Sequence, residues 1–309
     1  MTDVAGGPFG DLEVLGAMAP GEAAGYLRRV GEAGAASRLE AAAAEQDLRG
    51  VEPGRRKWPF NDRPWQYTAH ALGFIPAGAG EHPIRFAGAI EPDLSLRDST
   101  IKITLDRLRV ADYPGGSVHR ILFDFYARNQ TSEAGEEHLH FNSAFRVLEG
   151  QDAAVIGYPL FVGLNVGKHG VALRCLTVNV KNETDEKFLE FLESDAFRGG
   201  LRLVKTAQPV IAPFSEMALG LTKAIAGRHR NVPVQEFYLG LDFTSVSTGA
   251  RLAQGSYVVV QIPDRLQRVW DWNEWIYDPA TGQILYREDR RTLVPFNYIV
   301  FGVSAFEGG

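Results

Sequence analysis

Apolar and polar residues alternate in many places from about residue 84 onward, and this period of two predicts β-strands. Residues 101–105 show the pattern first. Residues 117–128 and 136–147 follow, each with its apolar side chains on one face, and the polar stretch between them predicts a hairpin with an inner and an outer side. Further strands are predicted at residues 153–157, 170–182, 237–243, 256–262 and 297–306, with a second hairpin at residues 274–287.

Two regions show helical spacing instead. The first, residues 19–50, is rich in alanine and is interrupted by Gly31 and Gly34, which predicts two short helices. Their apolar stripe is thin, so these helices must pack against something larger. The second region is residues 184–230, where Thr184 and Ser215 are each placed to cap the start of a helix.

Strands on either side of a helical block, without regular strand–helix alternation, predict an α+β fold that is mainly antiparallel β. The expected architecture is a two-sheet β-sandwich with an N-terminal helical arm and a helical insertion near residues 184–230. Pro59 and Pro64 predict an extended segment between arm and sandwich. The predicted division is residues 1–66, the arm with its extended Trp/Pro segment packed on the body, and residues 67–309, a single β-sandwich domain.

Three aspartates, Asp106, Asp112 and Asp124, flank the first turn of the β-region. The arrangement loosely resembles sandwiches of the C2 type, which also place aspartates at one end. Of the three, only Asp112 clearly falls in a loop. The resemblance implies a C2-like architecture and no particular function.

The charge and cysteine content exclude several classes of function. The chain has 309 residues, a net charge of −6 and a pI near 5.7, which argues against a surface that follows nucleic-acid phosphates. Its one cysteine, Cys175, cannot form an internal disulfide and fits a reducing compartment. The N-terminus does not read as a signal peptide, and apolar runs are too short to span a bilayer. A cytoplasmic protein without a membrane or nucleic-acid partner is therefore expected.

The stretch EEHLHFNSAFRVLEG carries the best candidate for chemistry. His138 and His140 lie two residues apart on a predicted strand, so both rings face the same side, as adjacent ligands of Zn or Fe do. If opposing residue numbers in the hairpin sum to 264–266, Asp124 lies across from His140 or Asn142 on that side. Glu136 shares the face if the strand extends back to it. The pattern predicts a metal site of His138, His140, Asp124 and Glu136.

The same residues suit an ordinary solvated face, because an amphipathic strand needs polar side chains on its outer side. The cupin pattern also begins with two histidines on a strand, but it requires a glutamate a few residues later, where this chain has Ala144 and Phe145. The metal site and the solvated face both remain open from the sequence.

Other motifs are weaker. The glycine-rich residues 163–170 differ from a phosphate-binding P-loop in two ways. Three residues rather than four separate Gly163 from Gly167, and His169 follows the lysine where a P-loop needs Ser or Thr. A turn between strands is therefore expected. Cys175 lies in an apolar strand and is expected to behave as a small core residue. The sequence has none of the common serine-hydrolase, metalloprotease or dinucleotide-binding motifs.

Tryptophan is concentrated near residue 270. Trp270 and Trp272 are predicted to share a strand face, with Trp275 on the other. Large aromatic residues of this kind close the end of a core or anchor a partner. Together with Trp58 and Trp65, Trp270 and Trp272 are the predicted interaction residues.

These features lead to the hypothesis of a non-enzymatic module that binds a protein partner or assembles with its own copies, without a cofactor. The alternative is a metal-dependent enzyme that uses Zn or Fe at His138 and His140, with a bound water as nucleophile.

Overall fold

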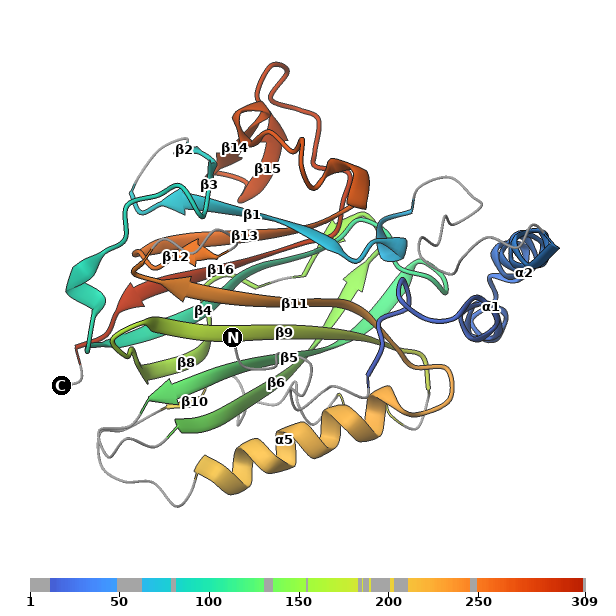
Figure 1. The fold of residues 1–309 in the computed structure, drawn as a ribbon, viewed down its shortest axis with the longest axis horizontal. Coiled ribbons are helices and arrows are strands. Elements are labelled where there is room, and N and C mark those ends of the chain that lie inside the picture. The colour runs from blue at the N-terminus through green and yellow to red at the C-terminus, as the bar shows by residue number, and fades with distance from the viewer. Residues whose placement is uncertain are drawn as a thin grey trace.

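Figure 1 shows the computed structural model of the chain. The structure describes residues 12–48, 63–78, 82–130, 136–153, 155–182, 185, 189, 201–202, 211–244 and 249–307. Strand accounts for 46% of it and helix for 19%, and the sheets are mostly antiparallel. The predicted α+β, mainly antiparallel β-sandwich is confirmed.

The larger sheet has eight strands. Seven follow the order β10-β8-β4-β16-β13-β1-β3, and β7 pairs with β4 beside this path. The bounds are β1 (Ala69–Pro76), β3 (Arg85–Phe86), β4 (Thr100–Val110), β7 (Gln151–Asp152), β8 (Tyr158–Asn165), β10 (Leu201–Arg202), β13 (Gly255–Ile262) and β16 (Tyr298–Ala305).

The second sheet has five strands in the order β12-β11-β9-β5-β6, and a small third sheet has the order β15-β14-β2. The bounds in the five-stranded sheet are β5 (Val118–Gln130), β6 (Glu136–Leu148), β9 (Gly170–Val180), β11 (Val232–Asp242) and β12 (Ala250–Arg251). Those in the third sheet are β2 (His82–Pro83), β14 (Trp275–Asp278) and β15 (Gln283–Tyr286).

The main core lies between the two large sheets. Phe125 of β5 contacts Phe161 of β8 and Phe301 of β16, with ring centroids 6.1 and 5.7 Å apart. All three rings are fully buried. The alternation predicted for these strands therefore places every second side chain in one shared interior.

Each outer face of the sandwich is partly covered (Figure 1). The helix α5 (Ile211–Ala226) packs its Ile225 and Ala226 against Leu122 and Leu176 of the five-stranded sheet. On the opposite side, Ile284 of β15 and Trp272, which precedes β14, pack on β13 and β16. The described part of the molecule thus has four layers, and α5 falls within the predicted helical insertion.

The N-terminal region forms the two predicted helices, α1 (Pro20–Arg29) and α2 (Ala33–Leu48). Tyr26 and Leu27 of α1 are buried and belong to the main core, which is the support that such Ala-rich helices need. The boundary between residues 66 and 67 stays a prediction. No helix in the described residues has both the length and the apolar character needed to cross a membrane.

The predicted hairpin is confirmed in register. β5 and β6 pair with opposing numbers that sum to 266, which puts Asp124 across from Asn142. The strand predicted at residues 153–157 is wrong in the part that the structure describes. There the Val155 N–H bonds back to the Ala153 carbonyl at 2.8 Å, and Gly157 has a φ of +62°, so β8 begins only after this turn.

One helix prediction and one strand prediction also need correction. Ser215 lies inside α5 rather than at its cap, because the helix starts at Ile211 and tolerates Pro213 in its first turn, where an N–H has no helical acceptor. Trp272–Glu274 forms the 3-10 helix η5 instead of a strand, since Asp271 accepts a hydrogen bond from the Asn273 N–H at 2.8 Å. Other short 3-10 helices are η2 (Pro64–Gln66), η3 (Leu94–Leu96) and η4 (Asp264–Leu266).

Candidate functional site

The two histidines of the H-x-H pair lie on the outer face of the five-stranded sheet, as predicted. His140 stands directly across from Tyr126, and the next pair toward α5 is Asn142 with Asp124. Asp124 Oδ1 lies 3.2 Å from His140 Nδ1. The structure therefore brings Asp124 and His140 together.

This part of the face is not solvated. Asp124 is 1% exposed and His140 2% exposed. Thr222 of α5 donates from Oγ1 to Asp124 Oδ2 at 2.8 Å. Asn142 donates from Nδ2 to Thr222 Oγ1 at 3.0 Å and to the Ala218 carbonyl at 2.8 Å. The solvated face, one of the two interpretations of the sequence, is wrong for Asp124, His140 and Asn142, because these side chains are buried and α5 supplies hydrogen-bond partners to Asp124 and Asn142.

His138 differs from His140 in its surroundings. It is exposed, and its Nδ1 pairs with the Tyr126 hydroxyl, whose ring stacks beside it with centroids 5.7 Å apart. Within the described part of the chain, no three His, Cys, Asp or Glu side chains are grouped so that they could hold a metal ion. The side chain of Glu136 lies outside the described residues, so the predicted four-residue set stays a prediction.

A row of four side chains crosses this face at the level of His140. His140 of β6, Tyr126 of β5, Arg174 of β9 and Tyr238 of β11 are direct cross-strand neighbours. We call these four residues the cross-strand row. The His140 and Tyr126 rings are 5.0 Å apart, and the Arg174 guanidinium lies 4.6 Å from the centre of the Tyr238 ring. At a strand spacing of about 4.8 Å, the row spans roughly 14 Å.

The charges of the cross-strand row are balanced inside the protein. Arg174 is 2% exposed and donates to Glu236, which precedes Tyr238 by two residues on the same face. Burial raises the pKa of Tyr238 to about 12, with Arg174 opposing the shift and Glu236 adding to it. The Tyr238 phenol is therefore protonated at neutral pH. A paired guanidinium and a neutral phenol suit binding better than proton transfer.

The sequence analysis did not identify Arg174, Glu236 or Tyr238 as site residues. Arg174 carried one usable signal, since it is the only charge within the apolar strand GVALRCLTV. Burial raises the pKa of the neighbouring Cys175 well above its usual value, which agrees with the expected core role of this thiol.

The predicted interaction residues are mostly inside the protein. Trp65 is 0% exposed and Trp272 is 6% exposed, so neither presents its ring to a partner of the folded chain. Trp270 is partly buried and stacks flat on Trp275, with centroids 5.7 Å apart. This contact also corrects the prediction that Trp270 and Trp275 lie on opposite faces. Trp58 lies outside the described residues.

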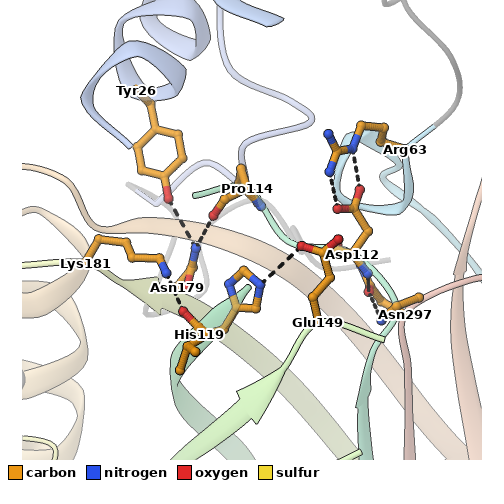
Figure 2. Close-up of polar contacts among 11 residues, drawn as sticks. Tyr26, Arg63, Asp112, Pro114, His119, Glu149, Asn179, Lys181 and Asn297 are labelled. Carbon is orange, nitrogen blue, oxygen red and sulfur yellow. Dashed lines mark hydrogen bonds and ion pairs between the residues drawn. The ribbon is translucent and has the colours of Figure 1, made fainter. Parts of the chain in front are cut away.

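A second polar cluster joins the helical arm to the sandwich (Figure 2). Tyr26 of α1 points toward Asn179 of β9, which donates to the Pro114 carbonyl at 2.8 Å. His119 lies beside them with a fully buried side chain, and its Nε2 is 3.8 Å from Glu149 Oε2. Tyr26 thus connects the arm to the five-stranded sheet at Asn179.

Two further contacts of this junction hold the segment before β5. Arg63 forms an ion pair with Asp112, and Asn297 accepts hydrogen bonds from the Ala111 and Asp112 N–H groups at 2.8 and 3.1 Å (Figure 2). The Asp112 carboxylate is thus already paired with an arginine. The C2-like resemblance stays a prediction from the sequence.

Comparison with protein-family models, with curated proteins and with solved structures found no match for this chain.

Proposed function

We propose that this chain is a non-enzymatic protein-binding module whose partner, another protein or a second copy of the chain, contacts the sandwich at Tyr238. The observation that supports the proposal is the state of this one ring. Tyr238 is 49% exposed, yet it lies against the buried Arg174 guanidinium. A large exposed aromatic side chain that is already held in place by the protein is a good contact for a partner.

Interface chemistry favours this interpretation. Tyr and Arg are among the residues that contribute most to protein–protein affinity. A tyrosine loses little conformational entropy on binding, and a cation beneath its ring reduces that loss further. Because its pKa is raised to about 12, the Tyr238 hydroxyl can donate a hydrogen bond throughout the physiological range.

Sedimentation velocity tests the self-assembly form of the proposal. We expect the wild-type chain to form a dimer or larger assembly at micromolar concentration, and Tyr238→Ala to weaken it by about 2 kcal/mol or more. Leu94→Ala is the matched control, because Leu94 is 59% exposed and lies in η3, away from the cross-strand row. The control should assemble like the wild type.

A wild-type chain that stays monomeric would restrict the partner to another protein. A photo-crosslinking phenylalanine analogue at position 238 then provides the test in cells, with the same analogue at Leu94 as reference. Crosslinks at position 238 that do not exceed those at position 94 would contradict the proposal.

One observation supports the alternative of a metal-dependent enzyme. The Asp124 carboxylate accepts a hydrogen bond from His140 Nδ1, which places the imidazole proton on Nδ1 and the lone pair on Nε2. Carboxylates orient metal-binding histidines in this way. In this alternative, His140 and His138 bind Zn or Fe together with Asp124 or Glu136, and the metal activates a water.

Elemental analysis of the purified protein distinguishes the two proposals. The alternative requires about one Zn or Fe per chain, with the metal lost in the His138→Ala/His140→Ala double variant. A His229→Ala variant, which removes an exposed histidine elsewhere, should keep the metal. Less than about 0.1 metal per chain in the wild type, after growth with added Zn and Fe, would contradict the enzyme.

A further inference from the structure

Two arginines lie on the outer face of the eight-stranded sheet because β4 contains a β-bulge. Leu105 pairs with Phe301, but Arg107 pairs with Val300, so Asp106 is an extra residue between them. The side chains therefore change face at this point. Without the bulge, Arg107 would follow Leu105 into the core. With it, Arg107 and Arg109 both point outward, beneath the β14–β15 hairpin.

One carboxylate serves both arginines. Arg107 Nη1 donates to Asp152 Oδ2 at 2.9 Å, and Arg109 Nη1 lies 3.6 Å from Asp152 Oδ1, beyond the usual length of a hydrogen bond. The other end of the Arg107 guanidinium donates to the Thr281 carbonyl at 3.0 Å. Gly282 leaves room for the Arg107 guanidinium, since a Cβ at this position would lie 1.8 Å from Arg107 Nη2. Its φ of +65° also favours glycine.

Two buried donors in this cluster are not used. Arg109 is 6% exposed, and its Nε has no hydrogen-bond partner among the described residues. Tyr298 stands directly across from Arg109 in β16 and is fully buried; the Ile284 N–H faces its oxygen, but the hydroxyl proton has no acceptor among the described residues. Burial raises the pKa of Tyr298, so the hydroxyl keeps its proton. Buried donors without acceptors are costly and are rare in folded proteins.

Both guanidinium groups of the cluster rely on the one carboxylate of Asp152. The nearby Asp106 carboxylate is engaged elsewhere, because it accepts hydrogen bonds from the Thr104 and Ser256 hydroxyls at 2.8 and 3.1 Å. A buried guanidinium with an unused donor edge can be satisfied by an anion.

We propose that Arg109 and Tyr298 form a binding site for a small oxyanion, a phosphate or a carboxylate group, between β4, β7, β16 and the β14–β15 hairpin. The edge of the Arg109 guanidinium that contains Nε donates to the anion, and the Tyr298 hydroxyl donates a further hydrogen bond. Arg107 and Asp152 hold Arg109 in position. The side chains of Arg107 and Asp152 are each 13% exposed, so the cluster reaches the surface.

This site is independent of the proposed protein-binding surface. It lies on the eight-stranded sheet, whereas Tyr238 and the cross-strand row lie on the outer face of the five-stranded sheet. Either proposal can fail without the other.

Isothermal titration calorimetry with inorganic phosphate tests the site, with NaCl matched for ionic strength. We expect saturable binding by the wild type. Arg109→Lys should weaken it by about tenfold or more, because lysine keeps the charge but loses the planar donor edge. Tyr298→Phe should weaken it several-fold while changing the melting temperature without phosphate little, since the hydroxyl proton has no acceptor to lose.

Two variants serve as controls. Arg268→Lys changes an exposed arginine, and Tyr286→Phe removes the hydroxyl of a partly exposed tyrosine in β15, so both should bind phosphate like the wild type. An acetate titration, alone and in competition with phosphate, identifies the source of the oxyanion. Acetate that binds and competes indicates a carboxylate ligand, and phosphate binding without acetate binding indicates a phosphate.

Two results would overturn the proposal. One is the lack of saturable binding of both phosphate and acetate by the wild type. The other is binding that Arg109→Lys and Tyr298→Phe leave unchanged, because the anion would then bind elsewhere.

Discussion

Thr222 shows how much a single hydroxyl group contributes to the candidate site. It is fully buried, donates to Asp124 and accepts from Asn142, so it links α5 to two strands of the sheet. We expect Thr222→Val to lower the free energy of unfolding by about 2 kcal/mol, because the shape is kept while buried polar groups lose their partner. Chemical denaturation with urea measures this change.

The matched control is Thr68→Val, at an exposed position, where the free energy of unfolding should change by less than about 0.5 kcal/mol. An equally small effect of Thr222→Val would mean that Asp124 and Asn142 find other partners, and that α5 is held by its apolar contacts alone.

At the scale of elements, the β5–β6 hairpin was predictable because its contacts are local. The apolar positions of both strands fixed which side faces the core, and the short connection limited the register. That was enough to place Asp124 on the face of His140. The packing of α5 over this face was not predictable from the sequence. Asn142 and Ala218 are 76 residues apart, and no pattern in either segment indicates their contact.

The bulge in β4 has a signal in the sequence. The buried apolar positions are Ile101, Ile103 and Leu105, all odd, and then Leu108 and Val110, both even. A change of phase within one strand is what an inserted residue produces. It indicates that Arg107 turns outward. The position of Asp152 and of the third sheet beside it could not be read from the chain, because each depends on pairings between distant segments.

At the scale of the whole molecule, both candidate sites lie where the sandwich carries an additional layer. The outer faces of the two large sheets are amphipathic, and α5 and the third sheet each cover part of one. Polar side chains at the border of a covered region are removed from water and must pair inside the protein. This explains why Asp124 and His140 are buried although a solvated face was one interpretation of their strands.

The burial of neutral histidines makes the stability of the whole molecule depend on pH. Burial lowers the pKa of His119 to about 4, with Lys181 lowering it further, and burial also lowers the pKa of His70 to about 4. In the unfolded chain both rings titrate near pH 6.5. Between about pH 6.5 and 4 the unfolded state therefore binds more protons than the folded state, and stability falls as the pH is lowered.

Urea denaturation at several pH values between 7 and 4.5 measures this dependence. We expect the free energy of unfolding to decrease by up to about 1.4 kcal/mol per pH unit for each histidine. Glu149 has the opposite effect, because burial, and after it the nearby Asp112, raises the pKa of its carboxyl group.

The double variant His119→Gln/His70→Gln isolates the contribution of the two rings. It lacks both titrating groups, so its stability should change less with pH between 6.5 and 5 than that of the wild type, even if it is less stable at pH 7. His229→Gln alters an exposed ring and should keep the wild-type slope. If the double variant and the wild type lose stability equally per pH unit, the rings of His119 and His70 are accessible to protons in the folded state. The junction in Figure 2 would then be open to water.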